Sequence, residues 1–384
     1  MSVDDMWVGL SNAARREPTG TADRTWLADA LLAGRGDAGR TNSGGPAGAS
    51  GHGGDSNRCD SVGSALTLAR RCSLETPLPG AGATIRRWEI LATIAAENLT
   101  AARVIEAHLD ALAILAEAQI EPATDLGALG VTADSTWGVF AAEAGGVRVD
   151  AARTQRGDSW CLTGIKPWCS LADRLSHALV TAYTGDGHRR LFAVALRDGT
   201  TTPIDQGWVS RGLPLVPSGP IELRSTPAIA IGADEWYLSR PGFAWGGAGV
   251  AACWFGGTVG LGRTVFAAAT ARPADQIGQL HLGAVDVALT GVRAVLAAAA
   301  QRIDDGTADG SDGVIVAGRA RAVAATAAEE VLTRSLHALG PAPLAFDERH
   351  AGRVADLQMY VRQHHAERDQ AALGRAVLAD GLPW

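Results

Sequence analysis

The sequence is short of residues that would tie a fold together covalently or through a metal ion. Its 384 residues include five cysteines, an odd number, and the cysteines are scattered without a CxxC pair. A disulfide framework and a structural zinc site are therefore not expected. The neighbouring His364 and His365 would point about 100° apart on a helix, which does not suit a shared ion. We expect no metal site.

Positive charge and long apolar runs are also scarce. The chain has 34 Lys and Arg against 41 Asp and Glu, a formal net charge of −7. This balance argues against a nucleic-acid partner, because proteins that bind nucleic acid cluster their basic residues. No uninterrupted apolar run reaches the roughly 18 residues that span a bilayer, so no membrane span is expected. The acidic start, MSVDDMWVGL, does not resemble a signal peptide, and the sequence predicts a cytoplasmic protein.

Common catalytic motifs are missing as well. The sequence contains no HExxH and no GxSxG, and its Gly-rich stretch has no GxxxxGK[ST] phosphate loop. Gly257, Gly260 and Gly262 approach a GxGxxG motif but in the wrong order and inside a predicted helix, which disfavours a Rossmann domain. The remaining composition, 47% apolar and 20% charged, is that of a globular protein with room for two or three domains.

Helical patterns come first along the chain. Residues 1–132 are expected to form an N-terminal helical domain, with a flexible Gly-, Ser- and Asn-rich loop at residues 34–60. Apolar residues recur at three-to-five spacing over Thr84–Ala118, which predicts a helix or two consecutive helices. Asn98 or Thr100 would cap the second of these.

A β-rich region and a second helical region follow. Residues 133–240 contain short β-rich runs separated by turn residues, which predict a central antiparallel β domain. Residues 241–384 are expected to form a C-terminal four-helix bundle. Its predicted helices cover Gly246–Ala271, Gly278–Ile303, Val314–Leu339 and Phe346–Leu378. Their many Gly and Ala residues allow close helix packing, within the chain and between the subunits of a homodimer or homotetramer.

The most specific stretch runs from Gly157 to Asp173 and reads GDSWCLTGIKPWCSLAD. Together with the order of the domains, it resembles the acyl-CoA dehydrogenase superfamily, whose β domain carries similar text around a K-x-W-x-(T/S) segment. The resemblance covers roughly residues 84–378. It implies an α+β fold with an N-terminal helical domain, a central antiparallel β domain and a C-terminal four-helix bundle. It also implies FAD as the cofactor.

The resemblance assigns residues to the flavin. In the family the Trp of the K-x-W segment packs against the flavin ring, and the hydroxyl two positions on reaches its reactive edge. These positions are Trp168 and Ser170, and alternation along a strand would point both to one face. The alternative for Trp168 is a place in the β-domain core. Further flavin contacts are expected near Ala142, from Arg272 on the FAD pyrophosphate across a subunit interface, and at Gly340. The alternative for Arg272 is a surface residue at a helix end.

The family's catalytic Glu aligns with Gln363, which cannot accept a proton at neutral pH. His364 and His365 are the nearest replacements, because their pKa range suits proton transfer, and Glu367 lies one turn on. The family's Gly-Ser-Asp segment, which helps to hold acyl-CoA, is reduced to Gly145-Gly146.

The preferred interpretation is an FAD-dependent oxidoreductase, similar to acyl-CoA dehydrogenases, that acts on a CH–CH bond of an acyl substrate such as a CoA thioester. Electron-transfer flavoprotein would then accept the electrons. Two alternatives stay open because the family's Glu is missing. One is a flavin monooxygenase or oxidase on the same fold, and the other is an inactive structural paralogue.

Overall fold

The structure is a computed structural model. It describes residues 3–10, 24–31, 54–154, 159–185 and 187–381. Contacts divide the chain into two compact units. The helical unit consists of residues Met1–Ile105, Arg211–Leu215 and Gly247–Trp384, and the β unit consists of residues Glu106–Ser210 and Val216–Gly246. The three-domain division expected from the sequence stays a prediction.

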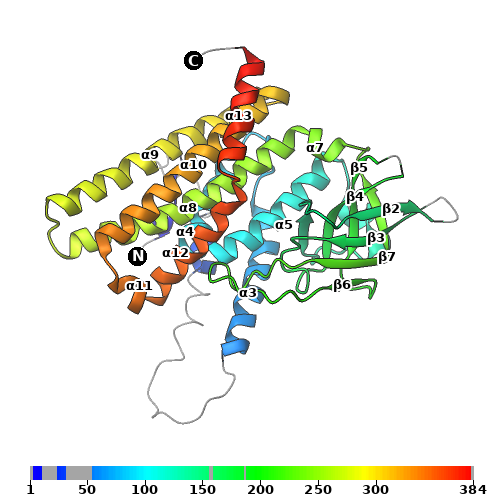
Figure 1. Cartoon of the computed structure of the whole chain (residues 1–384), viewed down its shortest axis with the longest axis horizontal. Coiled ribbons are helices and arrows are strands. Elements are labelled where there is room, and N and C mark those ends of the chain that lie inside the picture. Colours follow the sequence, from blue (N-terminus) through cyan, green and yellow to red (C-terminus); the bar gives the residue numbers. More distant parts are fainter. Residues whose placement is uncertain (1–2, 11–23, 32–53, 155–158, 186, 382–384) are drawn as a thin grey trace, which may run out of the picture. The chain divides into compact units, whose positions relative to one another are not determined.

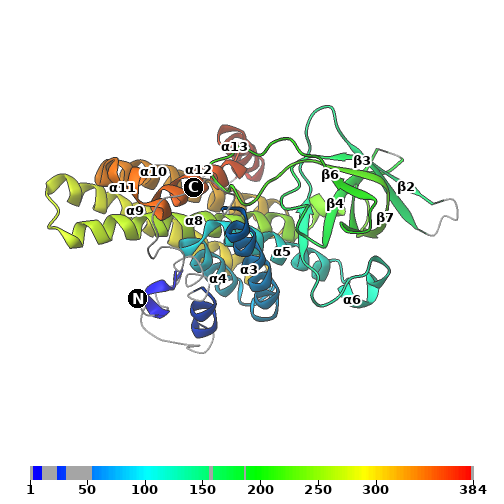
Figure 2. The ribbon, with the colours of Figure 1, turned by 90° about the horizontal axis from the view of Figure 1, so that it is seen from below.

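The helical unit contains helices from both ends of the chain (Figure 1). Its shorter and earlier elements are α1 (Val3–Met6), a helix over residues 24–31, α3 (Gly54–Glu75), α4 (Thr84–Glu97) and the start of α5 (Leu99–Glu117). Its later elements are most of α8 (Pro241–Ala271), α9 (Gln276–Asp304), α10 (Gly310–Leu339), α11 (Ala342–Phe346), α12 (Glu348–Tyr360), η3 (Val361–Gln363) and α13 (Glu367–Asp380). The turned view in Figure 2 shows α8, α9 and α10 lying lengthwise beside one another.

Local sequence explains several helix ends. The Asn98 side chain accepts a hydrogen bond of 3.0 Å from the amide of Ala101, so Asn98 begins α5 as predicted. Asp275 caps α9 in the same way through the amide of Gly278, at 2.8 Å.

Two expectations about the helices are wrong. The loop predicted at residues 34–60 ends early, because α3 already begins at Gly54; residues 34–53 lie outside the described residues. The single helix predicted over Phe346–Leu378 is interrupted between Gln363 and Glu367. The backbone leaves helical geometry there, and Ala366 adopts a positive φ of 47°.

Close helix packing is confirmed at the contact between α4 and α8. A Cβ atom built on Gly256 would lie 2.1 Å from the carbonyl oxygen of Ala92, so only glycine fits at this point of α8. The two helix backbones therefore touch, as the abundance of small residues predicts.

The segment Met6–Leu10 is fixed by side chains from three long helices of the same unit. The amides of Val8 and Leu10 donate to Thr93 Oγ1 (3.0 Å) and Glu89 Oε1 (2.9 Å) on α4. Arg263 of α8 donates to the Met6 carbonyl (3.1 Å), and Arg293 of α9 donates to the Gly9 carbonyl (3.1 Å).

The outer face of α9 is unusually apolar. Among the described residues, α9 is the one helix long and apolar enough to cross a membrane by length and composition. Asp286 and Arg293 interrupt the apolar run of α9, so the sequence of α9 does not contain the long uninterrupted apolar stretch that predicts a membrane span. The opposite face packs against α10 through buried residues such as Val285 and Leu296, as in a helix of a folded bundle. The absence of a membrane span stays a prediction.

The β unit is built on a seven-stranded sheet. Its strands are β1 (Trp137–Phe140), β2 (Val149–Arg153), β3 (Trp160–Lys166), β4 (His177–Tyr183), β5 (Arg189–Ala195), β6 (Thr201–Pro203) and β7 (Ile221–Ile231). The order is β1-β4-β2-β3-β7-β5, and β5 also pairs with β4, so the sheet closes into a barrel. The expected β domain is confirmed, but it is not wholly antiparallel, because β4 pairs in parallel with β1 and with β2.

The core of the β unit lies between this sheet and the second half of α5. Ile114 and Leu115 of α5 pack with Trp137, Leu179 and Leu191 of the sheet, and all five are buried. This core holds β1, whose end leads to Ala142, one of the candidate flavin residues.

Candidate functional site

The segment predicted to face the flavin follows β3 in the β unit. The strand ends at Lys166, so the alternation argument that placed Trp168 and Ser170 on one face does not apply. Instead Trp168 adopts a positive φ of 59°, and its side chain is 55% exposed. An exposed indole does not fill a core, which excludes the alternative role for Trp168. A large aromatic residue held in a strained conformation offers a flat apolar surface to a ligand.

Backbone and side-chain hydrogen bonds hold the segment in place. The amide of Cys169 donates to the Gly219 carbonyl at 2.9 Å, and the amide of Leu171 donates to the Pro217 carbonyl at 2.9 Å. The hydroxyl oxygens of Ser170 and Ser218 lie 2.7 Å apart. Ser170 is therefore positioned by a second loop, and Ser218 is a residue that sequence reasoning missed.

A buried ion pair lies at the start of this segment. Lys166 is only 1% exposed, and its ammonium donates to Glu143 Oε1 (2.7 Å) and Thr181 Oγ1 (2.8 Å). Burial lowers the pKa of Lys166, and the hydrogen bond and charge of Glu143 oppose that shift. The sequence does not reveal this pair, because Lys is rarely buried and its partner lies on another segment.

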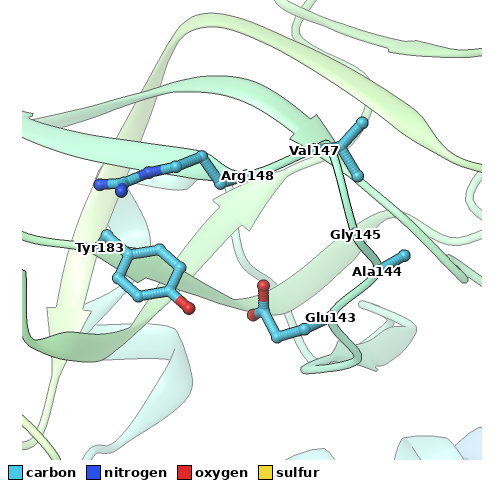
Figure 3. A pocket seen from close by; sticks show the side chains of 6 residues that line it. All are labelled: Glu143, Ala144, Gly145, Val147, Arg148 and Tyr183. Carbon is cyan, nitrogen blue, oxygen red and sulfur yellow. The ribbon is translucent and has the colours of Figure 1, made fainter.

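The Glu143 carboxylate also faces a shallow cavity of about 480 Å³ (Figure 3). The cavity is lined by Glu143, Ala144, Gly145, Val147, Arg148 and Tyr183. The Arg148 guanidinium lies over the Tyr183 ring, 4.5 Å from its centroid, and is paired with Asp150. Ala142, the predicted flavin contact, is exposed immediately before this cavity.

The three residues around the expected base lie at the interruption between α12 and α13 in the helical unit. Gln363 ends η3, and His364 follows it with an extended backbone. His364 is 7% exposed and its ring meets Trp254 of α8 edge-on, with 6.2 Å between the ring centroids. His365 is exposed, with Nδ1 3.3 Å from Asp369 Oδ1. The structure therefore separates the environments of the two histidines.

Arg321 of α10 connects the interruption to α8, and sequence reasoning missed it. Its guanidinium donates to the carbonyl oxygens of Gln363 (2.7 Å) and Gly247 (3.3 Å), and lies 3.6 Å from Asp369 Oδ2. It also lies over the Trp254 ring, 4.9 Å from the centroid. Trp254 Nε1 is buried without a hydrogen-bond partner among the described residues.

The pKa values of His364 and Asp369 are shifted by different causes. Burial, reinforced by the cations of Arg321 and Arg362, lowers the pKa of His364. Burial raises the pKa of Asp369, but the His365 amide and Arg321 outweigh it and hold that pKa below its usual range. At neutral pH the cluster therefore combines a neutral imidazole with an ionised, already paired carboxylate.

The residues predicted to bind FAD lie elsewhere in the helical unit. Arg272 is exposed just after the end of α8, and Gly340 ends α10 with a φ of 67°. Both helices end at one end of the bundle (Figure 1), whereas His364 contacts α8 at Trp254, which precedes Arg272 by 18 residues, roughly 27 Å of helix. A single chain thus does not bring Arg272 and Gly340 close to Gln363, His364 and His365. No group of three metal-ligating side chains occurs among the residues that the structure describes.

No family model and no curated protein matches the sequence. Solved structures match the fold along nearly the whole chain. A KijD3 in complex with FMN and dTDP-3-amino-2,3,6-trideoxy-4-keto-3-methyl-D-glucose has a TM-score of 0.71 at 19% identity, covering 96% of this chain and 95% of its own. A nitrososynthase from Micromonospora carbonacea var. africana has a TM-score of 0.69 at 18% identity and 100% coverage of both chains.

A third match is the FMN-bound TdsC, a dibenzothiophene monooxygenase from Paenibacillus sp. A11-2. Its TM-score is 0.69 at 15% identity, with 94% of this chain and 96% of its own covered. At such identities the likeness shows the fold alone. The expected fold similar to acyl-CoA dehydrogenases, with N-terminal helices, a central β domain and C-terminal helices, is confirmed.

Proposed function

We propose that this chain is a flavin-dependent oxidoreductase of the monooxygenase type, rather than an acyl-CoA dehydrogenase. The observation that carries the proposal is His364, a buried imidazole held neutral directly beside Gln363, the position at which the family resemblance places a carboxylate base. The neighbouring carboxylate, Asp369, is ionised and already paired with Arg321 and His365. A neutral imidazole can hold or move one proton, which suits oxygen chemistry on a flavin.

The residues of the β unit fit a flavin. The exposed Trp168 ring offers a flat wall for the isoalloxazine, and the Ser170 hydroxyl offers a hydrogen bond. When bound, reduced flavin supplies two electrons to oxygen, so that one oxygen atom enters the substrate and the other leaves as water. His364 would hold a proton at a ring nitrogen during that exchange.

We infer that FMN is the working flavin, in place of the FAD that the family resemblance implies. FMN is named in the KijD3 and TdsC structures that share the fold. FMN also lacks the pyrophosphate for which Arg272 is the expected partner. If FAD is bound instead, Arg272→Ala should weaken FAD binding about tenfold or more, because a guanidinium pairs bidentately with a pyrophosphate. Binding of FMN should not change in that variant.

The proposed location is the cytoplasm, where reduced flavin can be supplied. In the described part of the chain the four cysteines Cys72, Cys161, Cys169 and Cys253 are free thiols, which supports a reducing compartment. Electron-transfer flavoprotein would be the partner only if the chain acts as a dehydrogenase.

One anaerobic stopped-flow experiment separates the two activities. The protein is loaded with chemically reduced FMN, mixed with oxygen, and followed by flavin absorbance; a second sample holds oxidised flavin and is mixed with octanoyl-CoA. A monooxygenase-type protein changes the rate of flavin oxidation relative to free FMN and leaves the acyl-CoA sample unreduced. Bleaching of oxidised flavin by octanoyl-CoA would overturn the proposal.

The flavin contact has its own control. Trp168→Ala should weaken FMN binding about tenfold, by loss of a stacking surface. Trp160→Ala is the matched variant, because Trp160 of β3 packs instead between Arg153 and Phe192. Equal FMN affinity in both variants would show that Trp168 is not the flavin wall.

A further inference from the structure

Arg321 is the one side chain in the described part of α10 that contacts Trp254, Gln363 and Asp369 together. Its contacts reach α8, η3 and α13, and α8 is far in sequence from the other two. The side chain is 20% exposed, so most of these interactions are shielded from water. A guanidinium has five N–H donors in a fixed plane, which allows it to stack on an indole and donate at its edges at the same time.

The interruption between α12 and α13 needs such external support. Its residues leave the helical hydrogen-bond ladder, and Ala366 has a positive φ without being a glycine. Two side chains stabilise its backbone: Asp369 accepts from the His365 amide (3.2 Å), and Arg321 donates to the Gln363 carbonyl (2.7 Å). Both partners act immediately beside His364, on its two sides along the chain.

Arg321 also acts on His364 indirectly, through packing against Trp254. The guanidinium lies over the indole ring, 4.9 Å from its centroid, and the imidazole meets the same indole edge-on. Removing the guanidinium would free the indole that the imidazole packs against.

We propose that Arg321 is the positioning residue of His364, acting through the Gln363 carbonyl, the Trp254 ring and Asp369. The consequence for catalysis rests on the proposed function; the structural part does not. Arg321 acts by its planar shape as well as by its charge, so lysine cannot replace it.

Charged groups on several elements face His364 and have to be considered together. They are Arg321 and Glu329 on α10, Arg362 in η3 and Asp369 on α13. Arg362 is paired with Glu329 on the surface and makes no described contact with Trp254. Arg362→Met is therefore the matched control, since it removes a nearby cation and leaves the proposed support intact.

The first measurement is the NMR titration of the His364 imidazole, assigned by its loss in His364→Gln, in the flavin-free protein. In Arg321→Met we expect the pKa of His364 to rise, because a cation is removed, and its proton and carbon signals to shift, because the ring loses its fixed packing. Arg362→Met should move the signals much less. Arg321→Lys keeps the charge, so the pKa of His364 should change less, but the signals should still shift as in Arg321→Met because the planar support is lost. Thermal unfolding of each variant confirms that it is folded.

The second measurement is the oxidation rate of protein-bound reduced FMN. We expect Arg321→Met and Arg321→Lys to lower it about tenfold or more, since small displacements of a catalytic group are costly, and Arg362→Met to stay within about twofold. Unchanged His364 signals in Arg321→Met, or wild-type behaviour of Arg321→Lys, would overturn the positioning role. A changed His364 spectrum in a protein that never reacts with oxygen would support positioning and reject only the proposed function.

Discussion

Replacing Glu143 by Gln removes the charge that balances the buried ammonium of Lys166. In the wild-type chain Lys166 Nζ has two partners, Glu143 Oε1 at 2.7 Å and Thr181 Oγ1 at 2.8 Å. In Glu143→Gln the ammonium keeps neutral partners only, inside a site where Lys166 is 1% exposed. Breaking a buried pair in this way costs about 3 kcal/mol or more of unfolding free energy, because a buried charge is left uncompensated.

The loss of unfolding free energy in Glu143→Gln should become smaller as the pH rises. Burial already lowers the pKa of Lys166, and losing Glu143 lowers it further. Between that lowered value and the ordinary one, the unfolded chain binds more protons than the folded chain, so stability rises with pH. The penalty of Glu143→Gln is therefore full at neutral pH and shrinks as the pH rises and Lys166 loses its proton.

The assay is urea unfolding followed by circular dichroism and tryptophan fluorescence at pH 7 and pH 9.5. Asp150→Asn is the matched control, since Asp150 pairs with Arg148 and both side chains are more than half exposed. That variant should cost at most about 1 kcal/mol. The double variant Lys166→Met with Glu143→Gln should recover most of the loss, because it removes the buried charge as well. Equal costs for Glu143→Gln and Asp150→Asn would show that the buried pair stabilises the fold no more than the exposed one.

Three further predictions follow from other parts of the molecule. Gly256→Ala should destabilise the chain by about 2 kcal/mol or more, because the new Cβ would meet the Ala92 carbonyl at 2.1 Å, whereas Gly352→Ala, in open space on α12, should stabilise it by about 0.5–1 kcal/mol in the same denaturation assay. Burial lowers the pKa of His177, His350 and His364, so the unfolded chain takes up more protons than the folded chain below about pH 6.5. The melting temperature should therefore fall as the pH drops from about 6.5 towards about 5. A melting temperature that stays constant in calorimetry over that range would contradict these shifts. Val287, 72% exposed on the apolar face of α9, should lie in a contact between two copies of the chain. Val287→Glu should therefore shift sedimentation towards a smaller species. A wild-type protein that already sediments as a monomer would count against the expected homo-oligomer.

The order of helices and strands could be predicted because local patterns and tertiary packing agree there. Asn98 is a strong capping residue within a periodic apolar run, and it begins α5 as expected. Alternating β-rich runs with clear turn residues likewise predicted the strands, although their parallel pairings depend on contacts between distant segments.

The interruption at His364 could not be predicted from its own residues. The sequence QHHAER contains neither Gly nor Pro and would continue a helix on propensity alone. The break depends on Arg321, more than 40 positions earlier, and on capping by Asp369. Trp168 shows the same limit, since its K-x-W motif identified the residue, but the end of β3 and the positive φ decide how its ring is presented.

The contacts of Met6–Leu10 indicate the order in which parts of the chain fold during synthesis. Met6 and Gly9 are held by Arg263 and Arg293, which lie 257 and 284 positions later in the chain. During synthesis the β unit has all its residues once Gly246 has been made, whereas the helical unit still waits for most of its C-terminal helices. Contacts of such long range slow folding and leave apolar helix faces uncovered in the meantime. The β unit is therefore expected to fold first on the ribosome. The segment Met6–Leu10, although synthesised early, is expected to be among the last to pack.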